Sequence, residues 1–288
     1  MNDVWFNALE WCATNYLDQP ELIPTGIATL DRVFVGGMRP GVYTLLGKPG
    51  DGKSALALHI VQNIVARGLG AAVVTLEMPP HDVWLRIASD YSSCTGKNVF
   101  PWSKASALGR YASEHAIENP LHGGDPIPST AYDMKAFRLM IAEPPSPRID
   151  DVGALLLQAK EDGAHVAVVD YLQMIDVQGV SREYERISAA MRAIAKIAAD
   201  CRLPIILISS VNRDGLTTGV TMHGASGSSL IEYASVCVMT YRRAQDQSAA
   251  KSGTRAMELS VVKNRYGMIT DAPIRLEYWP QYNRVIEV

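Results

Sequence analysis

A glycine-rich segment, residues 47–54, has the pattern expected of a phosphate-binding loop. It reads GKPGDGKS and fits G-x-x-x-x-G-K-[ST]. Glycines let successive backbone N–H groups point at phosphate oxygens, and the helix that follows adds the positive end of its dipole. In this pattern the lysine, Lys53, reaches the β and γ phosphates and the hydroxyl of Ser54 binds Mg²⁺. The predicted nucleotide-binding residues are Gly47, Lys48, Pro49, Gly50, Asp51, Gly52, Lys53, Ser54 and Ala55.

Two acidic residues stand at the ends of apolar runs. Asp170 ends the run VAVVD, and Glu77 directly follows AVVTL. At the carboxyl edge of a parallel sheet, an aspartate can hold Mg²⁺ through water, and a glutamate can polarise a water that attacks the γ-phosphate. The alternative for each is a solvated side chain at a strand end, and spacing alone leaves the role of Glu77 open.

The elements that must position these residues alternate between short apolar runs and helical repeats. The expected strands are 42–46, 71–76, 164–170, 204–209 and 236–241, and the expected helices are 55–67 and 183–200. Near-continuous apolar runs are typical of buried parallel strands, and helices between them form the crossovers. Residues 257–263 and 273–278 fit an antiparallel pair at the end of the chain. The pattern predicts an α/β protein.

Three segments interrupt this alternation. Residues 91–147 are rich in Pro, Gly, Ser and Ala and are expected to form inserted helices and loops, and 212–229 form a long polar, glycine-rich connection. Connections of that length are usually functional or mobile. Residues 1–20 carry an apolar, aromatic surface on a predicted helix. That helix would pack either on its own domain or on a neighbouring subunit.

Composition narrows the class of protein. The 288 residues are 48% hydrophobic and 20% charged, which excludes a disordered, collagenous or coiled-coil chain. A net charge of -3 excludes a protein that coats nucleic acid through bulk positive charge, so any such contact must be local. Neither a signal peptide nor a membrane span is expected. Four scattered cysteines without C-x-x-C are typical of small buried residues in a reducing, cytoplasmic compartment.

The order of five motifs resembles a known family. They are GKPGDGKS at 47–54, TLEM at 75–78, VVDYLQMI at 168–175, SSVNR at 209–213 and VVKNRYG at 261–267. This order resembles the RecA-fold motor domain of DnaB-type replicative helicases, over roughly residues 23–288. The resemblance implies a RecA-like P-loop NTPase with a central, mostly parallel sheet flanked by helices, plus an N-terminal amphipathic helix. It divides the chain into a linker-like docking helix, 1–20, and an ATPase domain, 21–288.

The resemblance also assigns roles by position. Glu77 resembles the catalytic glutamate and Asp170 the Walker B aspartate, with ATP and Mg²⁺ as cofactors. Lys263 and Arg265 resemble the basic pair that one subunit offers to ATP in its neighbour's site, where a guanidinium can stabilise charge on the transferred phosphoryl group. From the residues alone, Arg265 is equally a surface cation on a strand. A site shared between subunits implies a homo-oligomer, and the family forms hexameric rings that move 5′ to 3′ on single-stranded DNA during replication.

Loops facing the channel of such a ring are the candidates for contact with single-stranded DNA. The residues singled out are Arg182, Asn212, Arg213 and Gly215. Backbone N–H groups and a few cations can hold phosphates without a basic surface, which agrees with the net charge. Plain solvated loops are the alternative.

The sequence departs from the family pattern in three places. Ser210 stands where the family usually has a glutamine that acts as a sensor, and Ser210 is too short to do so unaided. The segment around Glu232 lacks the acidic pair that normally follows. The family's N-terminal domain, which binds primase, is absent from this sequence, so a primase or loader protein is a candidate partner. Two other functions therefore stay open: a recombination ATPase like RecA or RadA, and a regulatory P-loop ATPase without motor activity.

Overall fold

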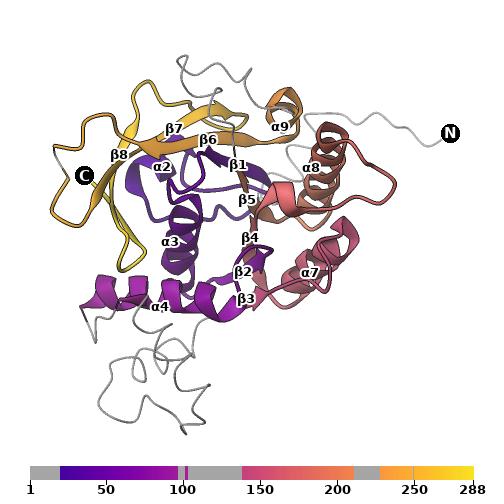
Figure 1. Ribbon diagram of the computed structural model, residues 1–288, viewed down its shortest axis with the longest axis horizontal. Coiled ribbons are helices and arrows are strands. Elements are labelled where there is room, and N and C mark those ends of the chain that lie inside the picture. The colour runs from indigo at the N-terminus through magenta and orange to yellow at the C-terminus, as the bar shows by residue number, and fades with distance from the viewer. Residues whose placement is uncertain (1–19, 97–100, 103–137, 211–227, 249) are drawn as a thin grey trace, which may run out of the picture.

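The computed structural model describes residues 20–96, 101–102, 138–210, 228–248 and 250–288. Within these residues one sheet of nine strands runs through the molecule (Figure 1). Its spatial order is β3 (Leu139–Ala142), β2 (Gly70–Thr75), β4 (Ala164–Asp170), β5 (Pro204–Ser210), β1 (Gly41–Gly47), β6 (Cys237–Arg243), β7 (Arg255–Asn264), β8 (Ile274–Trp279) and β9 (Arg284–Glu287). The strands from β3 to β6 are parallel, and those from β6 to β9 are antiparallel.

Helices cover both faces of the sheet, as Figure 1 shows. On one face lie α2 (Ala28–Val33), α3 (Lys53–Val65) and α4 (Pro80–Thr95). On the other lie α7 (Ile149–Glu161), α8 (Glu183–Asp200), α9 (Ser228–Ala234) and the short 3-10 helix η2 (Leu172–Met174). Each layer buries its own apolar cluster against the sheet. The predicted RecA-like α/β architecture, with a mostly parallel sheet between helices, is confirmed.

The apolar runs explain why the central strands are buried on both faces. Every residue of β2 is buried, as is nearly all of β1, β4 and β5. The expected strands and both expected helices occur with ends shifted by no more than two residues, and α8 has the predicted bounds. The antiparallel pair near the end of the chain is β7 and β8.

Several elements were not predicted. β3 lies inside the 91–147 region that we expected to contain only helices and loops, and its four residues are all half-exposed at the edge of the sheet. The N-terminal part of α4 and all of α7 and β9 were also missed. The strands β3 and β9 have only four residues each and are largely half-exposed, so their apolar residues are too few to give a clear periodic signal.

The parallel register brings the ends of four strands to one edge. Thr75 of β2 is the partner of Asp170 in β4, and Gly47 of β1 is the partner of Ser210 in β5. The residues that follow these positions therefore emerge side by side at the carboxyl edge of the parallel strands, the edge where open α/β sheets bind ligands.

The expectations for the N-terminal helix and for the cysteines are only partly tested or only partly right. The predicted helix in residues 1–20 lies outside the described residues except for Pro20. Cys94, Cys201 and Cys237 are unpaired, but only Cys237 is buried and Cys94 is exposed. None of the helices in the described part of the chain is long and apolar enough to span a bilayer.

Candidate functional site

The predicted phosphate-binding loop connects the end of β1 to the start of α3. Gly50 and Gly52 have φ values of 80° and 87°, a left-handed conformation that side chains with a Cβ rarely adopt. Gly47 has no room for a side chain, because a Cβ there would lie 2.4 Å from the carbonyl oxygen of Tyr241. The glycines at these positions therefore allow the loop its tight turn. The helix α3 begins at Lys53, with its free N–H groups facing the loop.

Lys53 is the buried cation of this loop. Its Nζ donates hydrogen bonds to the carbonyls of Gly47, at 2.9 Å, and Lys48, at 3.0 Å. Burial lowers the pKa of Lys53, while the negative charges of Asp170 and Asp51 oppose that shift. An ammonium held in this way sits where an anionic phosphate would gain most from it.

Asp170 ends β4 beside Ser54, at the first turn of α3. Burial raises the pKa of Asp170 to about 6, although a hydrogen bond with the Ser54 side chain opposes the rise. The Oδ1 atom is buried and finds no hydrogen-bond partner among the described residues. A buried carboxylate oxygen without a partner, next to a hydroxyl, suits a hard cation such as Mg²⁺.

The residues that the structure describes contain no cluster of three or more His, Cys, Asp or Glu side chains that could hold a metal alone. Mg²⁺ usually binds through one or two protein oxygens together with water and substrate phosphates. The pair formed by Asp170 and Ser54 therefore fits Mg²⁺ bound together with a nucleotide.

Glu77 follows β2 in a turn that is fixed by Thr75. The Thr75 hydroxyl donates to the carbonyl of Met78 at 2.7 Å and accepts from its N–H at 3.1 Å. Glu77 is exposed at this turn, and its negative charge helps to raise the pKa of Asp170. A solvated carboxylate close to the metal site can accept a proton from, or orient, a water molecule.

A cavity of about 440 Å³ joins these residues. Its lining includes the predicted residues Pro49, Gly50, Gly52, Lys53, Ser54, Ala55, Glu77, Asp170 and Ser210. Gly47, Lys48 and Asp51 complete the loop outside that lining. Arg243 of β6 anchors the loop, because its Nε lies 3.8 Å from Oδ1 of Asp51.

The lining residues that were missed in the sequence include Arg86, Trp102, Arg255 and Tyr278. Arg86 of α4 lies 4.2 Å from the centre of the Trp102 ring, and Arg255 lies 6.0 Å from that of Tyr278. The Nε of Arg86 is buried and has no hydrogen-bond partner within the described residues. Ile274, Leu276 and Tyr278 alternate with charged residues in β8, which predicts that Tyr278 is on the buried face, but no local pattern places it near the loop.

Lys263 and Arg265 lie at the opposite edge of the sheet. In the register of β6 and β7, Arg243 is opposite Met257 near the phosphate loop, whereas Val238 is opposite Lys263. Five residues of strand separate the two positions, about 17 Å. Neither cation belongs to the cavity lining. The predicted basic pair is therefore not brought to the phosphate loop of its own chain.

The basic pair instead binds carbonyls at the C-terminal end of α9. Lys263 Nζ donates to the carbonyls of Glu232 and Ser235, the latter at 2.7 Å, and Arg265 donates to that of Tyr233. Burial lowers the pKa of Lys263, and the charge of Arg265 lowers it further. Arg265 is the exposed member of the pair. Cations commonly stabilise helix C-termini in this way.

Of the candidate DNA-binding residues, only Arg182 belongs to the described residues. It is exposed at the start of α8 and lies 3.4 Å from Glu185. Asn212, Arg213 and Gly215 lie outside the described residues.

Known proteins have sequences similar to that of this chain. Residues 23–287 match the family described as DnaB-like helicase C terminal domain. The replicative DNA helicase DnaB of Geobacillus stearothermophilus is 24% identical over 92% of this chain and 56% of its own length. The replicative DNA helicase DnaC of Bacillus subtilis strain 168 is 26% identical over 66% of this chain and 40% of its own. The chain thus spans about half the length of the curated relatives it matches, or less.

Solved structures show the same fold. The ATPase domain of G40P has a TM-score of 0.77 and 16% identity, covering 98% of this chain and 99% of that one. A DnaB-like replicative helicase, described with its interactions with primase, also has a TM-score of 0.77, at 17% identity and over 99% of this chain and 68% of that one. With a family match over nearly its whole length and this fold, the chain belongs to the DnaB-like helicase C-terminal domain family.

Proposed function

We propose that residues 21–288 form the ATPase domain of a ring helicase that hydrolyses ATP and moves 5′ to 3′ along single-stranded DNA during replication. The observation that carries the proposal is the distance between the phosphate loop and the basic pair Lys263 and Arg265, which we assign to two halves of one site. The phosphate loop lies at one edge of the sheet, and the exposed Arg265 lies at the other. Two copies placed edge to edge would complete one site, and repetition of that contact closes a ring.

The first half of the site, around the phosphate loop, consists of Lys53, Ser54, Asp170 and Glu77. Lys53 neutralises charge on the β and γ phosphates, and Ser54 and Asp170 hold Mg²⁺, which when bound offsets further phosphate charge. Glu77 accepts a proton from the attacking water or orients it. Ser210 lines the cavity from the end of β5, where its short side chain would need a second group to sense the state of the phosphates.

Aromatic residues beside the loop suit the base of the nucleotide. The Tyr278 ring is so close to the loop that a Cβ on Gly52 would lie 3.3 Å from it. An aromatic ring and a guanidinium, here Arg255, both offer flat surfaces for stacking on a purine. This arrangement supports a nucleoside triphosphate as the ligand rather than inorganic phosphate alone.

The second half of the site belongs to the neighbouring copy. Arg265 stabilises charge on the phosphoryl group in transfer, and Lys263 accompanies it. Exposed apolar side chains surround this basic pair: Tyr233, Tyr266, Met268 and Ile269. Exposed apolar groups around a catalytic cation favour an interface between subunits over a solvated face. The helix predicted in residues 1–20 would dock on the adjacent copy.

Contact with DNA is proposed for residues that a ring would turn toward its channel. Arg182, Asn212, Arg213 and Gly215 supply cations and backbone N–H groups for the phosphates of single-stranded DNA. A net charge of -3 is compatible with this arrangement, because a ring repeats a few local contacts. A primase or loader protein is the proposed further partner. One structural neighbour is a DnaB-like replicative helicase that was studied with its interactions with primase, which supports that choice.

The test is ATP hydrolysis with and without single-stranded DNA, together with displacement of a strand from a forked duplex. We expect DNA to stimulate hydrolysis and the strand to be displaced with 5′ to 3′ polarity. Pairing of homologous strands without displacement would indicate a recombination ATPase instead. A rate of ATP hydrolysis that single-stranded DNA does not change would indicate a regulatory ATPase and would overturn the proposal.

A further inference from the structure

The side-chain amide of Gln173 joins two strand ends beside the candidate phosphate site. β4 and β5 pair through Val169 and Leu207, and the pairing ends there. Gln173 follows β4, and its Nε2 donates to the carbonyl of Ser210 at 3.0 Å. Its Oε1 accepts from the N–H of Ser210 at 3.2 Å. The amide thus supplies the hydrogen bonds that a longer β4 strand would make to β5, and it satisfies both backbone groups of Ser210.

Both the nitrogen and the oxygen of the Gln173 amide form hydrogen bonds. Its second N–H donates to the hydroxyl of Ser209 at 2.8 Å, and Ser209 is completely buried. Three hydrogen bonds to two consecutive residues leave the amide one orientation. A side chain held in this way transmits a displacement of its own backbone to the end of β5.

The backbone of Gln173 is held in turn by α8. Arg186 donates from Nη1 to the carbonyl of Gln173 at 3.0 Å and to that of Ile175 at 2.9 Å. These bonds fix η2 against the helix, and Gln173 is the middle residue of η2. The chain of contacts therefore runs from α8 through η2 to β5.

The two strand ends that Gln173 joins both matter for the proposed chemistry. One carries Asp170, three residues before Gln173, with its unpartnered buried oxygen. The other carries Ser210, which lines the same cavity and directly precedes the segment with Asn212 and Arg213. A change at the Asp170 end, such as metal or nucleotide binding, can reach Ser210 through the short stretch of chain from Asp170 to Gln173 and then through the hydrogen bonds of the Gln173 amide.

We propose that Gln173 is a positioning residue that couples the nucleotide site to the end of β5 at Ser210, and so to the stimulation of ATP hydrolysis by single-stranded DNA, an inference that rests on the proposed function. Without the amide, the ends of β4 and β5 move independently. The occupied site then no longer biases the position of Ser210. Coupling between two sites is typically a factor of about 5 to 150, so its loss is measurable.

The experiment compares Gln173→Met with Gln158→Met in the full chain. Met keeps the length of the side chain and removes the three hydrogen bonds. Gln158 is an exposed glutamine on α7 whose amide bonds only to Asp162 among the described residues. We measure kcat and KM for ATP with and without oligothymidylate. Gln173→Met is expected to keep KM within about twofold and to lose about tenfold of the stimulation by DNA. Gln158→Met is expected to match the wild type.

A second variant guards against simple misfolding. Gln173→Glu keeps the Oε1 acceptor but replaces the donor with an oxygen that faces the Ser210 carbonyl, so it is expected to lose stimulation as well. Wild-type stimulation in a folded variant of either kind overturns the role of Gln173, as does a raised KM with stimulation intact. A wild-type protein that DNA does not stimulate overturns the proposed function itself, and this inference with it.

Discussion

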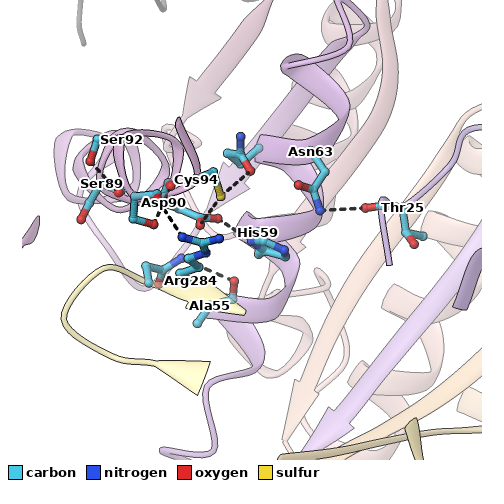
Figure 2. A network of polar contacts seen from close by, with 12 residues as sticks. Thr25, Ala55, His59, Asn63, Ser89, Asp90, Ser92, Cys94 and Arg284 are labelled. Carbon is cyan, nitrogen blue, oxygen red and sulfur yellow. Dashed lines mark hydrogen bonds and ion pairs between the residues drawn. The ribbon is translucent and has the colours of Figure 1, made fainter. Parts of the chain in front are cut away.

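His59 and Asp90 form a buried pair between α3 and α4, with 2.6 Å between Nδ1 and Oδ2. Figure 2 shows how neighbouring groups converge on this pair. The Sγ of Cys94 donates to the second oxygen of the same carboxylate at 3.5 Å, and Arg284 of β9 donates to a backbone carbonyl of α4 at 2.6 Å. The pair thus ties the helix that follows the phosphate loop to the helix that carries Arg86.

Removal of either partner from this pair is expected to destabilise the protein. Asp90→Ala leaves Nδ1 of His59 buried without its hydrogen-bond partner, and an unsatisfied buried polar group typically costs about 1–3 kcal/mol in free energy of unfolding. Asp90→Asn keeps the shape and one acceptor, so its cost is expected to be near 1 kcal/mol, roughly that of a hydrogen bond. Unfolding in urea measures both values.

The control is an ion pair of similar length on the surface. Lys196 and Asp200 lie 2.5 Å apart on α8, and both side chains are exposed. Exposed pairs contribute little to stability, so Asp200→Ala is expected to leave the urea midpoint almost unchanged. Equal shifts for Asp90→Ala and Asp200→Ala would contradict the importance of burial.

The buried, ionised carboxylate of Asp170 is expected to lower the free energy of unfolding at neutral and higher pH. Its pKa in the folded chain, about 6, lies above the ordinary 3.8 because of burial. The carboxyl therefore contributes stability that is fully present below about pH 4 and is lost as pH rises through 6. A shift of this size corresponds to about 3 kcal/mol. Asp170→Asn is thus expected to be more stable than wild type at pH 8 and nearly equal near pH 4, in urea unfolding without Mg²⁺. Lower stability at pH 8 would contradict this.

The same pKa predicts how Mg²⁺ binding depends on pH. A proton and Mg²⁺ compete for the carboxylate of Asp170, so the affinity for Mg²⁺ with ADP should be constant above about pH 7. Below pH 6 it should fall about tenfold per pH unit. Calorimetric titration measures this profile. The exposed Asp162→Asn should keep the profile and Asp170→Asn should lose it. An unchanged profile in Asp170→Asn would rule out Asp170 as the titrating group.

The carboxyl edge of the sheet follows from short-range patterns in the sequence. Apolar runs mark β2 and β4, and parallel strands end at the same edge, so Glu77 and Asp170 had to emerge near each other. The register confirms this position, with Thr75 opposite Asp170. The glycine spacing of residues 47–54 likewise predicts a sharp turn between a strand and a helix, because few other residues accept a positive φ.

The remaining lining of the cavity depends on contacts that no local pattern encodes. Trp102 reaches the site because its Nε1 donates to the carbonyl of Pro280, 178 residues away, at 2.8 Å. Arg86 is one polar residue on a helix with an otherwise ordinary amphipathic pattern. The role of Gln173 also cannot be predicted from a local pattern, because its three hydrogen bonds depend on where β5 ends. Tertiary packing, rather than periodicity, selects such residues.

Arg265 is expected to act on the site of a neighbouring copy, because about 17 Å of strand separates the basic pair from the phosphate loop. Lys53→Ala and Arg265→Ala should each lower kcat about 10³-fold. A mixture of the two should regain hydrolysis, since some interfaces then combine an intact Lys53 with an intact Arg265. Lys53→Ala mixed with Asp170→Asn should stay inactive, because both residues serve the same half of the site. If the first mixture is as inactive as the second while assembly is normal, Arg265 does not act between subunits.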